Sequence, residues 1–312
     1  MLRRLTTLWS NRVATTTPVF HNAVVASSGG DYTTLAAAEA ALTAPFVVVV
    51  KTGTYAGTTL AKAGLWIFDP GTIINTTALT VTGNKTGLVF GPGCDIQVLY
   101  QHTGTDAFSD MHNGVASVGL IFDGLRPFLS GGGWGSISNG GSTQHGLYFD
   151  DSPAATDGMA LNIEASTTST GAAVRSIKAD AIRTALSGVK VSQSDGSAIT
   201  TTVSTNTDLL ILGCLTLDCD VSGFLMGGPR FRAIANYFLS SGTDGISPSG
   251  AGDNSVMVAN IIKDPAESGI LIGTNDEDCV VVGNRVDPDG TGNAIDDNSG
   301  TSTVTANNTT TF

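Results

Sequence analysis

The last third of the sequence repeats itself at a fixed interval of 24 residues. The residues that keep this interval are Asn236, Asn260, Asn284 and Asn308, together with Val256, Val280 and Val304; Gly245-Ile246 returns as Gly269-Ile270 and, one residue late, as Ala294-Ile295. A fixed period of this length is typical of stacked structural repeats, in which no repeat can bury its apolar side chains alone. The period therefore predicts a solenoid.

The composition indicates that each repeat consists of strands. Gly, Thr, Ser, Asn and Val are abundant, charged residues are 13 % and hydrophobic residues are 41 %, which suits short strands and tight turns better than helices or disorder. Stacked turns place equivalent residues about 4.8 Å apart. We expect the valine column and the column of Ile246 and Ile270 to point inward. We expect the asparagine column to lie at a left-handed turn and to form hydrogen bonds along the stack.

Charge and cysteine content narrow the possible partners. The chain has 15 basic and 27 acidic residues, and this net charge of −12 opposes binding to nucleic acid, anionic membranes and polyanionic glycans. No apolar run is long enough to span a membrane, and the N-terminus lacks the apolar core of a cleaved signal. The cysteines show no metal-binding or disulfide spacing, so we expect buried thiols in a soluble protein without cofactors: Cys94, Cys214, Cys219 and Cys279.

The segment 29–55 has a distinct pattern. Residues 32–42 are rich in alanine and predict a short helix with Thr33 or Thr34 as N-cap, and residues 47–50 predict a buried strand of four valines. The series GDYTTL, AAL and VVVVKTGTY resembles the N-terminal cap of pectin-lyase-like right-handed parallel β-helices. The resemblance implies an all-β fold, a single-stranded right-handed parallel β-helix with a short N-terminal capping helix.

We divide the chain into an N-terminal arm, residues 1–28, and a β-helix, residues 29–312. The arm would dock on another protein through Arg3, Arg4, Trp9, Arg12 and Phe20; a disordered leader is the alternative. The β-helix would have irregular coils with insertions over 56–208 and regular 24-residue coils over 209–312.

Two features are expected within the irregular coils. The series GLWIF at 64–68 is echoed by GLVF at 87–90, and GLIF at 119–122 and GLYF at 146–149 would be later members. Residues 172–188 have apolar side chains at helical spacing and end at Gly188, which predicts a helix on the outside of the solenoid.

Asp218 and Asp220 are the best candidate catalytic pair. If Leu215, Leu217 and Cys219 point inward, the two carboxylates point outward, and residues two apart on a strand lie about 6.5–7 Å apart. This is near the separation that an inverting glycosidase uses. The alternative is a solvated strand face without a role.

Two further clusters are candidate binding sites. Arg230 and Arg232 alternate outward around Phe231 and would bind a carboxylate or phosphate of a glycan, or would simply be exposed. Asp253 and Glu277 share a repeat position, so their carboxylates would stack and hold a calcium ion, or splay into solvent. The histidines show no ligand spacing.

Three function classes remain. The catalytic residue sets of polygalacturonases, pectate lyases and pectin methylesterases are not recognisable in order or spacing. We therefore favour a non-enzymatic structural protein of a bacteriophage virion, of the tailspike, tail-fibre or head-spike type. It would assemble in the host cytoplasm as a homotrimer, attach to other virion proteins through its arm and contact host-surface polysaccharide. A polysaccharide lyase or glycoside hydrolase, and a non-catalytic glycan-binding adhesin, are the alternatives.

Overall fold

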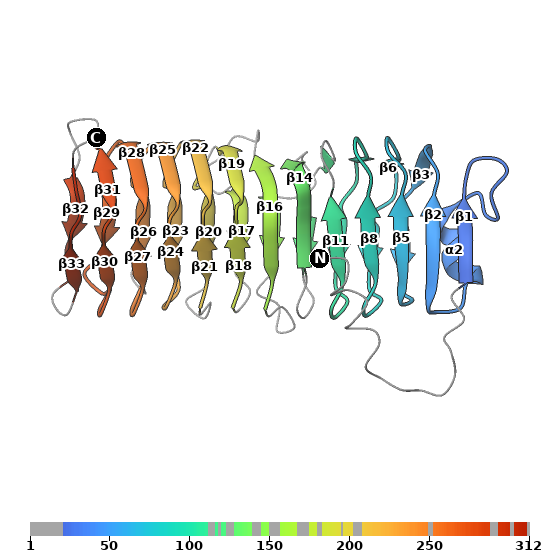
Figure 1. Ribbon diagram of the computed structural model, residues 1–312, viewed down its shortest axis with the longest axis horizontal. Coiled ribbons are helices and arrows are strands. Elements are labelled where there is room, and N and C mark those ends of the chain that lie inside the picture. The colour runs from blue at the N-terminus through green and yellow to red at the C-terminus, as the bar shows by residue number, and fades with distance from the viewer. Residues whose placement is uncertain are drawn as a thin grey trace.

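The protein forms one elongated parallel β-helix whose strands stack along the long axis of the rod (Figure 1). The computed structural model describes residues 21–111, 116–117, 120–122, 128–138, 145–149, 157–166, 175–179, 183–194, 196–201, 208–248, 252–287, 293–299 and 303–310. Each strand pairs in parallel with a strand one turn away, for example β2 with β5 and β27 with β30. The predicted fold class, all-β with one short helix, is confirmed.

Each turn of the rod contributes to three stacks of strands, which we call the first, second and third stacks. The first stack holds β1 (His21–Val25), β2 (Phe46–Val50), β5 (Gly64–Phe68), β8 (Gly87–Phe90), β11 (Phe108–Met111), the beginnings of β14 (Phe128–Ser138) and β16 (Met159–Ser166), β18 (Ala185–Ser187), β21 (Leu210–Leu212), β24 (Arg232–Ile234), β27 (Val256–Val258), β30 (Val280–Val282) and β33 (Val304–Ala306). The second stack holds β3 (Thr54–Ala56), β6 (Ile73–Asn75), β9 (Asp95–Ile96), β12 (Ala116–Ser117), the ends of β14 and β16, β19 (Lys190–Gln193), β22 (Leu215–Cys219), β25 (Tyr237–Ser241), β28 (Ile261–Pro265) and β31 (Arg285–Asp287). The third stack holds β4 (Thr59–Leu60), β7 (Leu79–Val81), β10 (Tyr100–His102), β13 (Leu120–Phe122), β15 (His145–Phe149), β17 (Arg175–Ala179), β20 (Ile199–Thr201), β23 (Phe224–Met226), β26 (Ile246–Pro248), β29 (Ser268–Ile272) and β32 (Asn293–Asp297).

The 24-residue period corresponds to one turn of the rod. Val256 pairs with Val280 and Val280 with Val304, so the valine column is aligned along the axis as predicted. The predicted direction of this column is wrong. Met257 and Val281 are the buried residues of these strands, whereas the valine column faces outward and Val304 is 55 % exposed. Because inward and outward positions of these strands are both apolar, the sequence carries no alternation from which the direction could be read.

The isoleucine column does point inward. Ile246 and Ile270 are fully buried and lie in register, and Ile295 follows in the next turn. Each such side chain contributes roughly 1.5–3 kcal/mol to folding through burial. This part of the core was predicted correctly from the 24-residue period.

The glycines before these isoleucines are required by close packing between turns. A Cβ atom at Gly245 would lie 2.6 Å from the carbonyl oxygen of Gly269 and 2.5 Å from Cγ2 of Ile262. Gly223 and Gly269 occupy the same position in neighbouring turns and would meet equally close contacts. The repeated glycine therefore lets each turn approach the next at the third stack.

We expect Gly245→Ala to lower the free energy of unfolding by about 2–3 kcal/mol, because the added Cβ would meet a backbone carbonyl and overpacking a rigid core forces its neighbours to move. Chemical denaturation measures this change. Gly213→Ala is the control, since a Cβ atom there meets nothing within 4 Å and only the left-handed backbone, φ 60°, costs free energy, about 1 kcal/mol. An equal or larger loss in Gly213→Ala would contradict the packing argument.

The bend between the first and second stacks is formed by a column of left-handed residues. They are Asn162, Gly188, Gly213, Ala235, Ala259, Gly283 and Asn307, with φ between 52° and 66°. The predicted left-handed asparagines are therefore wrong by one position, because Asn236, Asn260 and Asn284 each follow the left-handed residue and point into the core, where they are at most 1 % exposed. Their predicted hydrogen bonds along the stack are confirmed, as in Asn236 Nδ2 to Asn260 Oδ1 at 2.9 Å.

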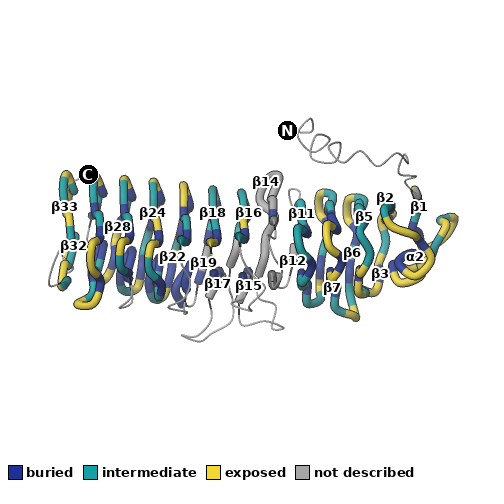
Figure 2. The backbone as a smooth tube through the Cα atoms, turned by 90° about the horizontal axis from the view of Figure 1, so that it is seen from below, coloured by how far each residue is buried: buried dark blue, intermediate teal, exposed yellow. Residues whose placement is uncertain are grey.

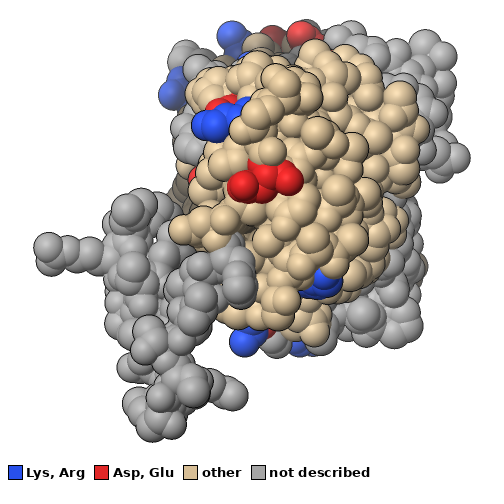
Figure 3. Space-filling model, turned by 90° about the vertical axis from the view of Figure 1, so that its right-hand side faces the viewer, with Lys and Arg blue, Asp and Glu red and all other residues tan. Residues whose placement is uncertain are grey.

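The helix α2 (Leu35–Ala41) covers the N-terminal end of the rod, with Thr34 as its N-cap, as predicted (Figure 1). Its attachment is polar: Glu39 accepts hydrogen bonds from the backbone N–H groups of Ala61 and Lys62, and Lys62 Nζ donates to carbonyl groups at the C-terminal end of the helix. Seen from this end, the described surface carries few charged side chains (Figure 3). The first stack starts earlier than residue 29, since β1 pairs with β2 in full register.

The predicted outer helix at 172–188 is wrong. Arg175–Ala179 is β17 and Ala185–Ser187 is β18, and they belong to different stacks. Ile177 and Leu186 are both buried, but from two separate strands that pair with Leu147 and Ala160 of the preceding turn. Pairing with a strand that already exists satisfies the backbone and overrides the helical spacing.

The predicted series of GLxF segments is correct for its first two members only. Phe68 and Phe90 lie in register, with rings stacked at 4.6 Å. The later segments lie in β13 and β15, which pair with each other in the third stack instead. Similar strands thus occur on different sides of the rod, because all three stacks need apolar residues inside.

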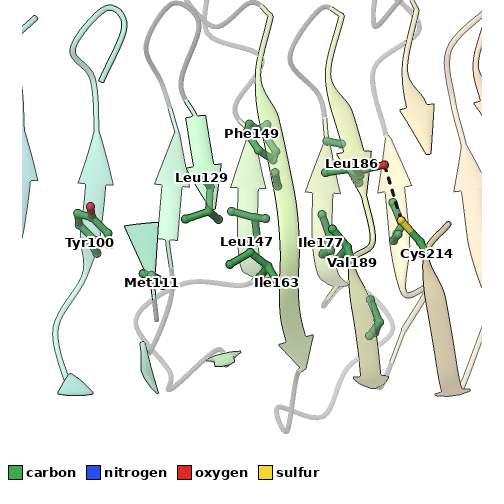
Figure 4. Packing of buried hydrophobic residues seen from close by; sticks show 14 of the residues in the cluster. Tyr100, Met111, Leu129, Leu147, Phe149, Ile163, Ile177, Leu186, Val189 and Cys214 are labelled. Atoms are coloured by element: carbon green, nitrogen blue, oxygen red, sulfur yellow. Dashed lines mark hydrogen bonds between the residues drawn. The ribbon is translucent and has the colours of Figure 1, made fainter. Parts of the chain in front are cut away.

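The core runs the length of the rod between the three stacks. Buried residues alternate with outer ones along many of the strands, such as β2 and β5, and exposed residues gather at the turns (Figure 2). In the middle of the rod, side chains from all three stacks meet, and the thiol of Cys214 donates to the carbonyl oxygen of Leu186 (Figure 4). All four cysteines are free and buried, as predicted, and burial raises the pKa of Cys214 to about 12.

A polar cluster interrupts the core in the N-terminal half. His102, Tyr100 and Ser109 are completely buried, and His102 Nε2 lies 2.6 Å from the Tyr100 hydroxyl and 3.0 Å from Ser109 Oγ. The Tyr100 and Ser109 hydroxyls are also hydrogen-bonded to each other. Burial lowers the pKa of His102 to about 3, so this imidazole is neutral in the folded protein at neutral pH.

Candidate functional site

The two candidate carboxylates, Asp218 and Asp220, lie at one open hollow on the flank of the rod. The hollow has a volume of about 370 Å³, and its lining residues are Asp218, Cys219, Asp220, Ser240, Ser241, Gly242 and Asp264. Asp218 and Asp220 are both exposed. The predicted pair therefore shares one surface, and Asp264 adds a third carboxylate from two turns further along the rod.

This surface is shaped by a second column of left-handed residues. Asp218, Ser240 and Asp264 have φ of 51°, 58° and 53° and occupy equivalent positions in β22, β25 and β28. The predicted alternation in β22 is wrong, because Thr216 and Cys219 are buried whereas Leu215 and Leu217 face outward. The left-handed residue at 218 kinks the strand, so that the inward positions are three residues apart instead of two.

The hollow is polar and acidic. Burial, together with the negative charges of Asp218 and Asp220, raises the pKa of Cys219 to about 12, so this thiol stays protonated and unreactive at neutral pH. Carboxylates and serine hydroxyls accept hydrogen bonds from hydroxyl groups. Among the described residues, no group of three or more His, Cys, Asp or Glu is placed to hold a metal ion. The surface can therefore contact a hydroxyl-rich ligand through its acceptors.

Arg230 and Arg232 do alternate outward around Phe231, which is 1 % exposed. Their surroundings differ. Arg230 forms a two-pronged ion pair with Asp208, with Nε at 3.1 Å and Nη2 at 3.3 Å from the two carboxylate oxygens. Arg232 lies on the outer face of β24, between Leu210 and Val256 of the neighbouring turns. Glycan binding by this pair stays a prediction, and at Arg230 a ligand would have to compete with Asp208.

A row of alternating charges leads up to Arg230 and was not predicted. Asp157, Arg183, Asp208 and Arg230 all have left-handed backbones at the turn that precedes the first stack. Arg183 pairs with Asp157 at 2.6 Å, and the hydrogen bond from Arg230 lowers the pKa of Asp208, with smaller effects from Arg232 and Arg183. Opposite charges about one repeat apart in the sequence were the signal that would have indicated this row.

Asp253 and Glu277 lie one turn apart, as their repeat position implied. Asp253 Oδ1 accepts a hydrogen bond of 2.9 Å from the backbone N–H of Glu277. The Asp253 carboxylate therefore links two turns of the backbone. Calcium binding at this pair stays a prediction.

The predicted anchor residues lie outside the described residues. They are Arg3, Arg4, Trp9, Arg12 and Phe20. Residues 21–25, which we had assigned to the same arm, form β1 and pair with β2. The part of the arm that could dock elsewhere is thus limited to residues 1–20.

Comparison of the chain with protein-family models and with curated protein sequences gave no match. The class that the fold defines is that of parallel β-helix proteins. None of the helices in the described ranges is long and apolar enough to cross a membrane.

Proposed function

We propose that this protein is a structural component of a bacteriophage virion, of the tailspike, tail-fibre or head-spike type, whose rod contacts glycan on the host surface. The observation that carries the proposal is the open hollow around Asp218, Asp220 and Asp264 on the side of a long rod. A stack of turns that are hydrogen-bonded and packed along their whole length is a stiff spacer. Acceptor groups on its flank suit the hydroxyl groups of a neutral sugar chain.

Glycan binding without cleavage is the first test. The protein is titrated with neutral and acidic surface polysaccharides of bacteria, and reducing ends and unsaturated sugars are assayed after incubation. We expect binding of a neutral polysaccharide and no released sugar. The double variant Asp218→Asn/Asp220→Asn should weaken binding about fivefold or more, because hydrogen bonds to charged acceptors are roughly twice as strong as neutral ones.

Asp278→Asn is the matched control for this test. Asp278 is exposed and left-handed, φ 54°, like Asp218. It lies outside the hollow, at the bend that precedes the first stack, in the same repeat position as Arg230. We expect it to bind polysaccharide like the wild type. Equal losses in the control and the double variant would contradict a binding role for the hollow.

Attachment to particles is the second test. Deletion should remove residues 1–20 only, because a deletion to residue 28 would also remove β1 from the first stack. The shortened protein should keep its fold by circular dichroism and should no longer be incorporated into phage particles. Incorporation at the level of the full chain would contradict anchoring by the arm.

A polysaccharide lyase or glycoside hydrolase is the second candidate function. The observation that favours it is that Asp218 and Asp220 do share one hollow, as a pair of catalytic carboxylates would. Release of sugar by the wild type that disappears in both single variants, Asp218→Asn and Asp220→Asn, would establish this function in place of the structural one.

A further inference from the structure

Two adjoining outer faces of the rod are apolar in its C-terminal part. The outward residues of the first stack here are Leu210, Leu212, Ile234, Val256, Val258, Val280 and Val282, and those of the second stack are Leu215, Leu217, Tyr237, Leu239 and Ile261. None of these side chains is buried, and Leu212 and Tyr237 are 38 % and 36 % exposed. We call this surface the apolar face.

Few charged side chains lie on or next to the apolar face. The outward positions that interrupt it are Arg232, Lys263, Arg285 and Asp287. Lys263 and Asp287 lie in register on neighbouring strands, so opposite charges adjoin each other. The carboxylates of the hollow lie at the C-terminal ends of the second-stack strands β22 and β28. A chain with a net charge of −12 repels its own copies, and this face is where the repulsion is weakest.

The apolar face is as large as the apolar patches that often have a function in other proteins. Four first-stack strands and three second-stack strands, spaced about 4.8 Å apart, extend roughly 19 Å and roughly 14 Å along the rod, and strands of three and five residues side by side span roughly 27 Å. Together the two halves cover roughly 400 Å² of flat surface before side-chain relief is counted, which lies within the roughly 300–600 Å² of the largest apolar patch on a typical monomer, a kind of patch that is often functional.

The edge where its two halves meet allows close approach. The bend between the stacks carries Gly213, Ala235, Ala259 and Gly283, all exposed and all small. A flat surface with rows at the spacing of β-strands is matched by another surface with the same rows, and sheets pack face to face at about 10 Å. A second copy of this chain offers such a surface, with the same spacing and the same small edge.

We propose that the apolar face is the contact through which copies of this chain pack side by side along their rods. Because the two halves of the face meet at an angle around the small edge, one half of each copy packs on the other half of its neighbour. Contacts of this head-to-tail kind close into a ring when the rotation between copies fits, and a ring of three is the assembly that we expected from the sequence. This inference gives a surface to the homotrimer that we expected from the sequence.

Measurement of mass in solution tests the inference. The full chain has a mass of 31.8 kDa, and we expect a trimer of the wild type at micromolar concentration by sedimentation equilibrium or light scattering. The double variant Leu212→Lys/Val258→Lys should be a monomer with an unchanged circular dichroism spectrum, because buried unpaired charges oppose the contact. If this variant does not fold, Val258→Thr/Val282→Thr is measured in its place, because threonine has nearly the volume of valine. We expect this second variant to raise the dissociation constant of the trimer at least tenfold.

The matched control is Leu225→Lys/Leu271→Lys. These leucines are partly exposed and face outward in the same way, but from the third stack. The control should remain trimeric. A monomeric wild type, or dissociation of the control to the same extent, would overturn the inference. A trimer that depends on the apolar face but binds no glycan and is absent from phage particles would refute the proposed function and leave the interface standing.

Discussion

Replacing Asn260 with alanine is expected to lower the free energy of unfolding by about 3–5 kcal/mol. Asn260 is fully buried, and its Oδ1 accepts hydrogen bonds from the backbone N–H of Asn236 at 3.1 Å and from Asn236 Nδ2 at 2.9 Å. Its Nδ2 donates to the carbonyl oxygen of Ala233 and to Asn284 Oδ1, both at 2.9 Å. Alanine would leave several buried groups without partners, and each such group costs about 1–3 kcal/mol.

Chemical denaturation measures the global loss. Because turns of a solenoid can open separately, hydrogen exchange at the Asn236 amide should be measured as well. Asn308→Ala is the control, since Asn308 ends the ladder and is only partly buried. We expect a smaller loss there, and exchange at Asn236 close to that of the wild type. Equal effects of the two substitutions would contradict the cooperative ladder.

The second large effect concerns pH. We expect the protein to lose stability as the pH falls below about 6.5, by about 1.4 kcal/mol per pH unit from His102 alone. Burial lowers the pKa of His102 in the folded state to about 3, whereas in the unfolded chain it is near 6.5. Between these values the unfolded state binds the proton and the folded state does not. The contribution of neutral His102 to the free energy of unfolding is therefore fully present above pH 6.5 and is lost progressively as the pH falls toward 3.

His102→Gln separates this contribution from the other titrating groups. Glutamine does not titrate and can still form hydrogen bonds with Tyr100 and Ser109. Burial raises the pKa values of Glu39 and Asp244, so these carboxyl groups act in the opposite direction in acid, and they are common to both proteins. The difference in unfolding free energy between wild type and variant should change by roughly 3 kcal/mol between pH 7 and pH 4.5. A difference that does not depend on pH would contradict the assignment to His102.

The sequence was sufficient to predict the stacking of turns. Asn236, Asn260 and Asn284 lie at equal intervals because each must meet the next one along the rod, and such a requirement leaves a visible period. The capping helix was also predictable, since Thr34 and the alanines that follow it are local signals. Properties that depend on one residue type at one repeat position are thus readable from a single sequence.

Other features could not be predicted, for physical reasons. The valine column at Val256 has apolar neighbours both inside and outside, so its direction is invisible in the sequence. Residues 175–187 have helical spacing, but pairing with the turn before them decides their structure. Of the hollow, Asp218 and Asp220 were found as a local pair. Asp264 joins them only because left-handed residues line up across two turns.

The asparagine ladder has a direction. Asn236, Asn260 and Asn284 each donate from Nδ2 to Oδ1 of the next asparagine toward the C-terminus, and the series starts where Asn236 accepts the N–H of Cys214. A winding inserted between Asn236 and Asn284 would therefore find the same donor before it and the same acceptor after it. Lengthening by duplication of whole windings, about 4.8 Å each, would leave both ends as they are. The length of such a rod can therefore change by whole windings without any change to the residues at its ends.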